Sequence, residues 1–551
     1  MVSYLHNKGC IALCVENMQR PGGELAPLEV VEMFVTVFCF LKDSAEQDSA
    51  TLLEDFRACQ GYLFLSEFLL KLDKAPKEET ETNEAIRNLV LLVASLSFCN
   101  HTELEQSAAS SSSSMLYELD SFTRPQPENK GSTVRNLQAF QVLQSVFLKS
   151  ESAQVTSTIL DAVSTIYTAD NANYFLLEGQ NTLSQFAERV WRKPPRAQEK
   201  FFQLVEFLVH HLKYVPCKEL VALSLLLKAH RSTECCILAV ATLQSILRFD
   251  DVFKNVFREV GMLEVLVALL QSYSDYLKSF LIVERTEEAR PREEMAKLGV
   301  AVMSVLGDLL SGGSSNGENA AVLRKLGGAA AIVNLIRSEE SRDPALALMH
   351  QLVLCGNEED MTALLELLHS SPSILAGTDK SAPEMVEMKV EVLRVVIACL
   401  KESHRARAIF RRVGGFVYII SVLVSLEGTL SGREGGNEKK VFALLRGVFA
   451  CLTTAMRYEP ANARYFQVEI NCGNSMVETV KLLGCFEADN HDGSAKLTRM
   501  AEEGPKSEHR KFFKDVFVSD VNSEEFDSLI QGVIIFTCEI GSAVRCQNLC
   551  Q

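Results

Sequence analysis

The side chains best suited to chemistry in this sequence form a basic cluster between positions 401 and 412. Lys401, Arg405 and Arg412 stand at i, i+4 and i+11 and can share one helical face. Further basic side chains within the cluster are His404, Arg407 and Arg411. In a chain of net charge −16, such a face could dock an acidic peptide or a phosphoinositide head group. The residues favour a simpler interpretation, a solvated helix end whose cations interact with the C-terminal end of the helix dipole.

Other residues that could do chemistry lack the context that the chemistry needs. Segment 432–436 carries three glycines ahead of two lysines, but it lacks the Gly-Lys-Ser/Thr ending and the preceding strand of a phosphate-binding loop. His210 and His211 are adjacent, so their side chains diverge on a helix and do not suit a metal site. The sequence has neither a Gly-x-Ser-x-Gly nucleophile elbow nor a paired-histidine motif with a catalytic glutamate. We therefore predict no catalytic residue, no metal site and no cofactor.

Charge and composition narrow the classes of partner. The 55 Lys and Arg against 71 Asp and Glu disfavour nucleic acid and anionic membrane surfaces as general partners. Several phenylalanines fall at helical spacing and are better explained by core packing than by base stacking: Phe201, Phe202, Phe207, Phe253 and Phe257. The 16 cysteines lack metal-ligand spacing, and no stretch reaches the roughly 18 apolar residues of a membrane span. We expect free thiols in a reducing cytoplasm and no membrane insertion.

A recurring turn organises the helices that carry these residues. An apolar residue stands four positions ahead of a glycine in four places: Phe175–Gly179, Phe257–Gly261, Leu323–Gly327 and Phe410–Gly414. Glycine at a helix end adopts the left-handed conformation without the Cβ clash that other residues suffer. After the last three glycines, apolar residues follow at +2, +5, +6 and +9, which is one stripe of an amphipathic helix, whereas after Gly179 the stripe is displaced. The pattern predicts helix pairs that must stack on neighbours to bury their stripes.

Weaker copies extend the array towards both ends. Leu5–Gly9 leads into Ile11 and Leu13, and Asn462–Glu469 parallels Asn171–Glu178. The glycine intervals of 82, 66 and 87 residues each fit two units of about 40 residues, the armadillo/HEAT length. We therefore predict an all-α, armadillo/HEAT-like helical solenoid with a disordered Ser-rich insertion. The expected segments are helical repeats over 1–105, a flexible Ser/Pro-rich insertion over 106–133, an armadillo-like solenoid over 134–486 and a divergent, partly disordered tail over 487–551.

Longer segments of the chain carry a more specific resemblance. They are Gly131–Gln144, Ala169–Phe175, Leu183–Glu188, Val215–Leu220, Phe257–Val265, Glu402–Arg407, Val413–Ile419 and Ala455–Asn462. Together they resemble the N-terminal armadillo-type region of the autophagy-linked WD-repeat and FYVE proteins of the BEACH family, over roughly residues 9–486. The resemblance implies a large cytoplasmic scaffold that binds proteins in selective autophagy of aggregates and in membrane trafficking.

The same resemblance limits what can be carried over to individual residues. In that family the PH-like and BEACH domains, the WD40 propeller and the FYVE finger lie downstream of the helical array. Nothing in this chain matches them, so no lipid-binding residue is assigned. The tail after Phe486 departs from the family pattern, which suggests a fragment, an alternative end or a faulty gene model.

The expected function is that of a non-enzymatic scaffold or adaptor whose helix faces bind protein partners. One alternative is an enzyme or enzyme-regulating module with its activity in residues 512–540, which the lack of an acid–base or nucleophile constellation disfavours. Another is a generic helical-repeat module that acts in assembly without an autophagy role. Because the recurring turns are structural, recognition should fall on the helix faces between them.

Overall fold

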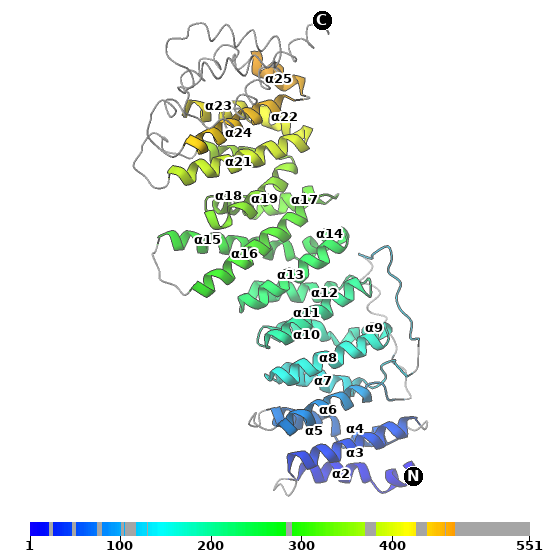
Figure 1. The fold of residues 1–551 in the computed structure, drawn as a ribbon. Helices are drawn as coiled ribbons and strands as arrows, with labels where there is room; N and C mark the ends of the chain where they lie inside the picture. Colours follow the sequence, from blue (N-terminus) through cyan, green and yellow to red (C-terminus); the bar gives the residue numbers. More distant parts are fainter. Residues whose placement is uncertain are drawn as a thin grey trace, which may run out of the picture. The chain divides into compact units, whose positions relative to one another are not determined.

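The chain folds as a succession of helices in the computed structural model (Figure 1). The structure describes residues 1–20, 26–46, 51–73, 80–100, 104, 117–128, 131–282, 289–313, 315–369, 382–425, 438–457 and 459–468. Every regular element within these ranges is a helix, which confirms the all-α prediction. The serine run 107–114, the glycine-rich segment 432–436 and the tail 487–551 lie outside the described residues.

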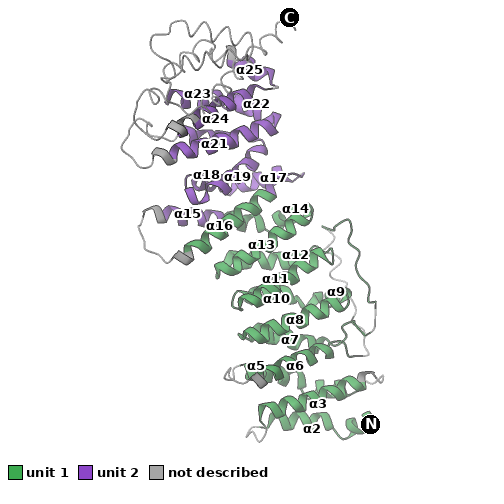
Figure 2. Cartoon of the chain, in the orientation of Figure 1, with its two compact units in different colours: residues 1–269, 287–308 green, residues 270–286, 309–551 purple. Residues whose placement is uncertain are grey.

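The helices fall into two compact units (Figure 2). Unit 1 comprises residues 1–269 and 287–308, and unit 2 comprises residues 270–286 and 309–551. The division falls within α15 (Met262–Ile282) and α16 (Ala289–Leu310). It therefore lies inside the stretch 134–486 expected as one solenoid, and the expected boundaries at 105, 133 and 486 stay predictions.

Unit 1 stacks its longer helices in two layers. Neighbours in the first layer are α3 (Pro27–Glu46), α6 (Thr80–Leu96), α8 (Ala153–Ala169), α11 (Pro195–His210) and α13 (Thr233–Phe249). Neighbours in the second layer are α5 (Gly61–Asp73), α7 (Leu137–Lys149), α10 (Thr182–Val190) and α12 (Cys217–Ala229). The remaining helices of unit 1 are mostly short: α1 (Val2–Asn7), α2 (Cys10–Gln19), α4 (Thr51–Ala58), α9 (Ala172–Leu177) and α14 (Val252–Glu259). The core lies between the layers, where Phe140 of α7 and Ile159 of α8 are both 0% exposed.

Unit 2 repeats the two-layer arrangement. One layer contains α18 (Gly328–Ile336), α20 (Glu358–His369) and α23 (Gly415–Ser425). The other contains α19 (Arg342–Leu354), α21 (Ala382–Glu402) and α24 (Glu438–Met456). The remaining helices are α17 (Asn316–Lys325), α22 (His404–Arg412) and α25 (Pro460–Val468). Apolar stripes of both layers meet in the core, as the period of the sequence predicts.

Several helices begin where the sequence supplies a capping side chain. Ser152, Ser232 and Ser403 precede α8, α13 and α22, and each Oγ accepts a hydrogen bond from the N–H three residues on, at 3.5, 3.3 and 3.1 Å. Asn136 caps α7 in the same way at 3.1 Å. Such caps satisfy N–H groups that the first turn of a helix leaves unpaired. The cap at Ser403 also separates α21 from α22, and so divides the basic cluster between two helices.

The recurring turn is a single left-handed residue between two successive helices. Its backbone φ is positive at Gly9 (62°), Gln60 (58°), Asn181 (49°), Gly261 (72°), Gly327 (78°) and Gly414 (74°). The residue four positions earlier is apolar each time: Leu5, Phe56, Leu177, Phe257, Leu323 and Phe410. The helix before the turn and the two helices after it together make a three-helix repeat, which is typical of armadillo proteins. Helix pairs such as α7–α8, α12–α13 and α20–α21 stand between these triplets.

One predicted copy of the turn is anchored two residues too early. Gly179 lies in the 3-10 helix η2 (Glu178–Gln180), and the left-handed residue is Asn181. Counted from Asn181, the buried side chains fall at +2, +5, +6 and +9, as after the glycines: Leu183, Phe186, Ala187 and Val190. Asparagine reaches the left-handed region more readily than most residues with a side chain, so a search for glycine overlooks it. The apolar stripe, which is displaced when counted from Gly179, is therefore in the common register when counted from Asn181.

The number of helical repeats between the glycines also differs from the prediction. The 66 residues between Gly261 and Gly327 form one long helical repeat rather than two, because α15 and α16 have 21 and 22 residues. The first copy also differs in detail, since Leu13 is 54% exposed while Ile11 is buried. Glycine spacing alone therefore does not count the units.

Part of the segment expected to be flexible is packed against unit 1. The ring of Phe122 lies 5.9 Å from that of Phe175 and 5.6 Å from that of Tyr214, measured between centroids. The guanidinium of Arg124 lies 5.3 Å from the centroid of the Phe175 ring. Leu119 is only 4% exposed. Residues 117–128 are thus held on α9 and on the loop before α12.

Buried asparagines tie short helices to the long helices before them. Asn173, Asn319 and Asn462 are each 0% exposed. Their Nδ2 atoms donate to carbonyls in the last turn of the preceding helix: Ile166 at 2.7 Å, Leu309 at 3.2 Å and Ala455 at 2.8 Å. Carbonyls in that turn have no N–H partner within their own helix. The side-chain amide supplies the missing donor and fixes the angle between the helices.

Candidate protein-binding groove

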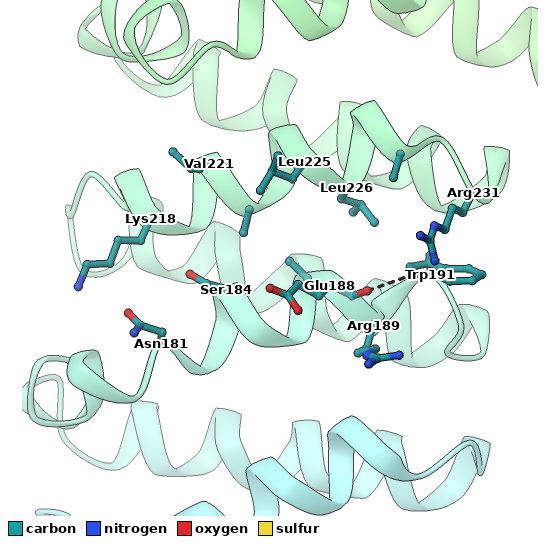
Figure 3. A pocket seen from close by; sticks show the side chains of 13 residues that line it. Asn181, Ser184, Glu188, Arg189, Trp191, Lys218, Val221, Leu225, Leu226 and Arg231 are labelled. Atoms are coloured by element: carbon teal, nitrogen blue, oxygen red, sulfur yellow. Dashed lines mark hydrogen bonds between the residues drawn. The ribbon is translucent and has the colours of Figure 1, made fainter.

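An open groove runs between α10 and α12 in unit 1 (Figure 3). Small and aliphatic side chains form its floor: Ala187, Val221, Ala222, Leu225, Leu226 and Ala229. Leu225 is 59% exposed and Val221 is 42% exposed, although the opposite face of α12 is buried. The cavity volume of about 680 Å³ lies within the range of ligand-binding clefts. The groove therefore presents uncovered apolar surface in a concave setting.

The ends of the two helices define the ends of the groove. α10 begins after the left-handed Asn181, and α12 ends at His230, whose φ of 41° is also left-handed. The two helices run in the same direction, because α11 returns the chain between them. Asn181 and Lys218 consequently lie at one end, and Trp191 and Arg231 lie at the other (Figure 3).

Basic side chains stand at both ends, and a single acid stands between them. Lys218 lies at the first end, whereas Arg189 and Arg231 lie at the second, and all three are exposed. Glu188 projects near the middle of the groove (Figure 3). In the described part of the chain, neither Arg189 nor Arg231 has an ion-pair partner. Their charges are thus available to a ligand.

Trp191 is fixed at the second end of the groove. Its Nε1–H donates to the carbonyl oxygen of Glu188 at 3.2 Å. The guanidinium groups of Arg192 and Arg231 lie 4.8 and 5.0 Å from its ring centroid. Such cation–π contacts contribute about 0.5–1 kcal/mol each at exposed sites. Because Trp191 is the only tryptophan of the chain, its fluorescence reports on this end of the groove alone.

Lys218 has a structural role in addition. Its Nζ lies 3.7 Å from Oε1 of Glu178, and Nη2 of Arg124 lies 3.6 Å from the other oxygen of this buried carboxylate. Glu219, also buried, accepts a hydrogen bond from the hydroxyl of Tyr174 at 3.1 Å, and burial raises the pKa of the Glu219 carboxyl. Two buried carboxylates need nearby cations, so the charge of Lys218 is partly committed to the fold.

The predicted basic cluster lies in unit 2 and is split. Lys401 is exposed in the last turn of α21, whereas Arg405 and Arg412 belong to α22. Nε of Arg412 lies 3.0 Å from Oε1 of Glu358, and the side chain of Arg405 packs on the backbone of Gly356. Arg412 therefore pairs with the acidic first turn of α20, and Arg405 packs on the loop that precedes this helix. This explains them as packing partners, and ligand docking by these three residues stays a prediction.

The remaining sequence candidates have structural partners. Nε2 of His210 lies 3.0 Å from Oγ of Ser245, whereas the ring of His211 stacks on Phe207 with centroids 4.8 Å apart. Buried phenylalanines fill the core as expected: Phe201, Phe202, Phe253 and Phe257. In the described ranges, no group of three or more His, Cys, Asp or Glu is placed to hold a metal ion.

No single described helix combines the length and apolarity needed to cross a membrane. The pairs α17–α18 and α22–α23 reach both only when joined, and they bend by 82° and 68°.

The sequence analysis did not identify the groove. Leu225 belongs to a run of leucines, and hydrophobic periodicity assigns it to the core with its neighbours Leu223 and Leu227. Its exposure depends on which faces of α12 the neighbouring helices cover, which no local pattern encodes. The signal that the sequence offers is the lone Trp191 among the basic residues Arg189, Arg192 and Lys193.

These features define an armadillo-like helical-repeat fold. A family model described as armadillo-like repeats matches residues 357–495. WD repeat- and FYVE domain-containing protein 4 from Mus musculus is 29% identical over 499 residues, covering 88% of this chain and 15% of the relative. Its Homo sapiens counterpart is 29% identical over 508 residues, covering 90% and 15%. BEACH domain-containing protein A2 from Arabidopsis thaliana is 22% identical over 368 residues, covering 60% and 10%.

The comparisons confirm the resemblance to WD-repeat, FYVE and BEACH proteins. The similarity extends over nearly the whole chain, beyond the segments that first indicated it. The chain spans about 15% of the length of the curated WD repeat- and FYVE domain-containing relatives that it matches.

Proposed function

We propose that this chain is a non-enzymatic scaffold segment that binds protein partners, with the groove between α10 and α12 as its principal binding site. The observation that carries the proposal is the pair of uncovered apolar side chains, Leu225 and Val221, between two basic ends. Exposed apolar surface bordered by polar residues is typical of interaction sites on helical-repeat proteins. The armadillo-like fold supports the same function, since its stacked helices offer extended surface.

We further propose that the segment serves a BEACH-type cytoplasmic scaffold in selective autophagy of aggregates and in membrane trafficking. The similarity to WD repeat- and FYVE domain-containing protein 4 and to a BEACH domain-containing protein supports this assignment. The alternative is a generic helical-repeat assembly module without an autophagy role. The identity of the proteins that bind the groove separates the two.

Interaction mass spectrometry with a groove variant tests the proposed function. Leu225→Asp puts a charge on the floor of the groove, at a side chain too exposed for the change to unfold the chain. Val417→Asp is the matched control, because Val417 is 57% exposed on α23 in unit 2. We expect Leu225→Asp to lose a set of partners by at least about tenfold, corresponding to roughly 1.4 kcal/mol, while Val417→Asp retains them.

Each outcome of this comparison decides between the proposals. Autophagy or trafficking proteins among the lost partners support the finer assignment, whereas cytoskeletal or other assembly proteins favour the generic module. Recovery of the same partners with the unchanged chain, Leu225→Asp and Val417→Asp would exclude the groove as the binding site.

A further inference from the structure

We infer that the groove accepts an acidic amphipathic helix of a partner protein, with carboxylates at both ends of the helix and an apolar face between them. This inference rests on the proposed function, because it names the class of partner for the same groove. It follows from the order of charges, the length of the groove and the kind of side chains on its floor.

The order of charges fixes where the ligand is acidic. Lys218 stands at one end, and Arg189 and Arg231 stand at the other, so carboxylates at both ends of a ligand find a cation. Glu188 lies between them and repels an acid at the middle of the ligand. A uniformly acidic segment is therefore a poorer ligand than one with acidic ends and an apolar centre.

The length of the groove suits a helix. Lys218 and Arg231 are 13 positions apart along α12 and its C-terminal turn, so they span about 20 Å at roughly 1.5 Å per residue. A helical ligand of three to four turns covers this distance and presents residues i, i+3, i+4 and i+7 to the floor. Alanines at positions 187, 222 and 229 keep the floor low enough for a ligand helix to lie close to Val221 and Leu225.

An extended ligand fits the lining less well. An extended peptide needs partners for its backbone N–H and C=O groups along its whole length. The uncharged polar side chains of the groove are few, with Asn181 at one end and Ser184 nearby, and the charged ones are Glu188 and the basic side chains of the two ends. The Oγ of Ser184 is buried and has no hydrogen-bond partner among the described residues, so it offers no accessible group to the backbone of an extended ligand. A helix satisfies its own backbone and needs no such group.

Other classes of ligand fit the charges poorly. Single-stranded nucleic acid needs cations along the entire path of the backbone, whereas Glu188 interrupts the groove. Trp191 is held by two guanidinium groups and does not form an open stacking face. The partner is accordingly a protein segment.

A fluorescence titration of the full chain with synthetic helical peptides tests the inference. The first peptide carries glutamates at both ends and leucines at i, i+4 and i+7, the second replaces the glutamates with lysines, and the third moves two glutamates to the centre. Because Trp191 is the only tryptophan, a shift in its emission reports binding at the groove. We expect binding of the first peptide at micromolar concentration and at least about tenfold weaker binding of the other two.

Charge variants of the groove locate the binding. Arg189→Glu should weaken the first peptide by about tenfold, and Glu188→Gln should tighten it severalfold, because the two adjacent residues carry opposite charges. Lys325→Glu is the matched control: it makes the same charge change as Arg189→Glu, on an exposed residue of α17 in unit 2, and should alter the affinity less than about twofold.

Several results would overturn the inference. One is equal affinity of the chain for the acidic and the basic peptides, and another is an affinity for the first peptide that Arg189→Glu does not change. The third is concentration-dependent self-association of the chain that Leu225→Asp abolishes. The proposed function survives such a result if cellular partners are still lost on Leu225→Asp. It fails separately if the peptide binds as expected but no cellular partner depends on Leu225.

Discussion

Replacing Asn173 by leucine should destabilise the α8–α9 region by about 4 kcal/mol. The Asn173 amide is 0% exposed and holds three backbone groups: Nδ2 donates to the carbonyls of Ser132 and Ile166 at 2.9 and 2.7 Å, and Oδ1 accepts from the N–H of Val134 at 2.8 Å. Leucine has the same branched shape but can form none of these hydrogen bonds, and each buried group left unpaired costs about 1–3 kcal/mol.

Hydrogen exchange measures this effect locally, since a chain of two compact units need not unfold in one step. We expect the amides of α8 and α9 to lose roughly a thousandfold of their protection, at about 1.4 kcal/mol per tenfold. Asn171→Leu is the control, because Asn171 lies two residues earlier, is exposed and makes no capping hydrogen bond. Equal protection in the two variants would show that the buried amide does not hold these helices together.

Gly415→Ala should destabilise unit 2 by about 2 kcal/mol, although alanine is normally the better helix former. A Cβ on Gly415 would stand 2.5 Å from Cδ2 and Cε2 of Phe410. Phe410 is 0% exposed and its ring packs edge-on against Phe416 at 5.1 Å, so it has no room to withdraw. Overpacking of this kind costs about 1–3 kcal/mol and outweighs the better helix propensity of alanine.

The same substitution at Gly307 should have the opposite sign. Gly307 lies inside α16, and a Cβ there would meet nothing within 4 Å. Gly307→Ala should therefore stabilise its helix by about 1 kcal/mol through helix propensity alone. Exchange protection of α22–α23 and of α16 reads out the two changes. A stabilising Gly415→Ala would mean that the close approach of Gly415 to Phe410 does not limit this position.

The recurring turn shows how far local sequence reaches in this fold. The turn requires only a left-handed residue with an apolar residue four positions before it, which is a local pattern. Three glycines, each followed by the same apolar stripe, made this pattern visible in the sequence. Asn181 and Gln60 adopt the same conformation at φ of 49° and 58°. Since their side chains make them poorer candidates for a left-handed turn, the sequence pattern concealed both copies.

The packing of segments far apart in sequence could not be predicted. Phe122 and Arg124 lie in a stretch rich in proline and polar residues, which indicates a loop, yet they pack on Phe175 and beside Glu178. Likewise, the basic cluster was evident, but not that Arg412 pairs with Glu358, 54 positions earlier. Local composition states which side chains are charged, whereas the stacking of helices decides which charges are neutralised.

The groove illustrates the same limit for function. Its floor consists of residues that resemble core residues in the sequence, and the packing of the helices leaves Leu225 and Val221 uncovered. The similarity to much longer relatives indicates a scaffold but names no binding residue. The candidate site therefore follows from Leu225, Val221 and Trp191 in the structure rather than from the resemblance.

Site-specific photo-crosslinking tests most directly whether protein partners bind between α10 and α12. A photoreactive amino acid replaces Val221 in the full chain, and in a parallel chain it replaces Val417, which is exposed on α23 in unit 2. We expect position 221 to capture discrete partner proteins, and Leu225→Asp in the same chain to abolish the products. Crosslinks from 417 but none from 221, or products that persist with Leu225→Asp, would contradict the account.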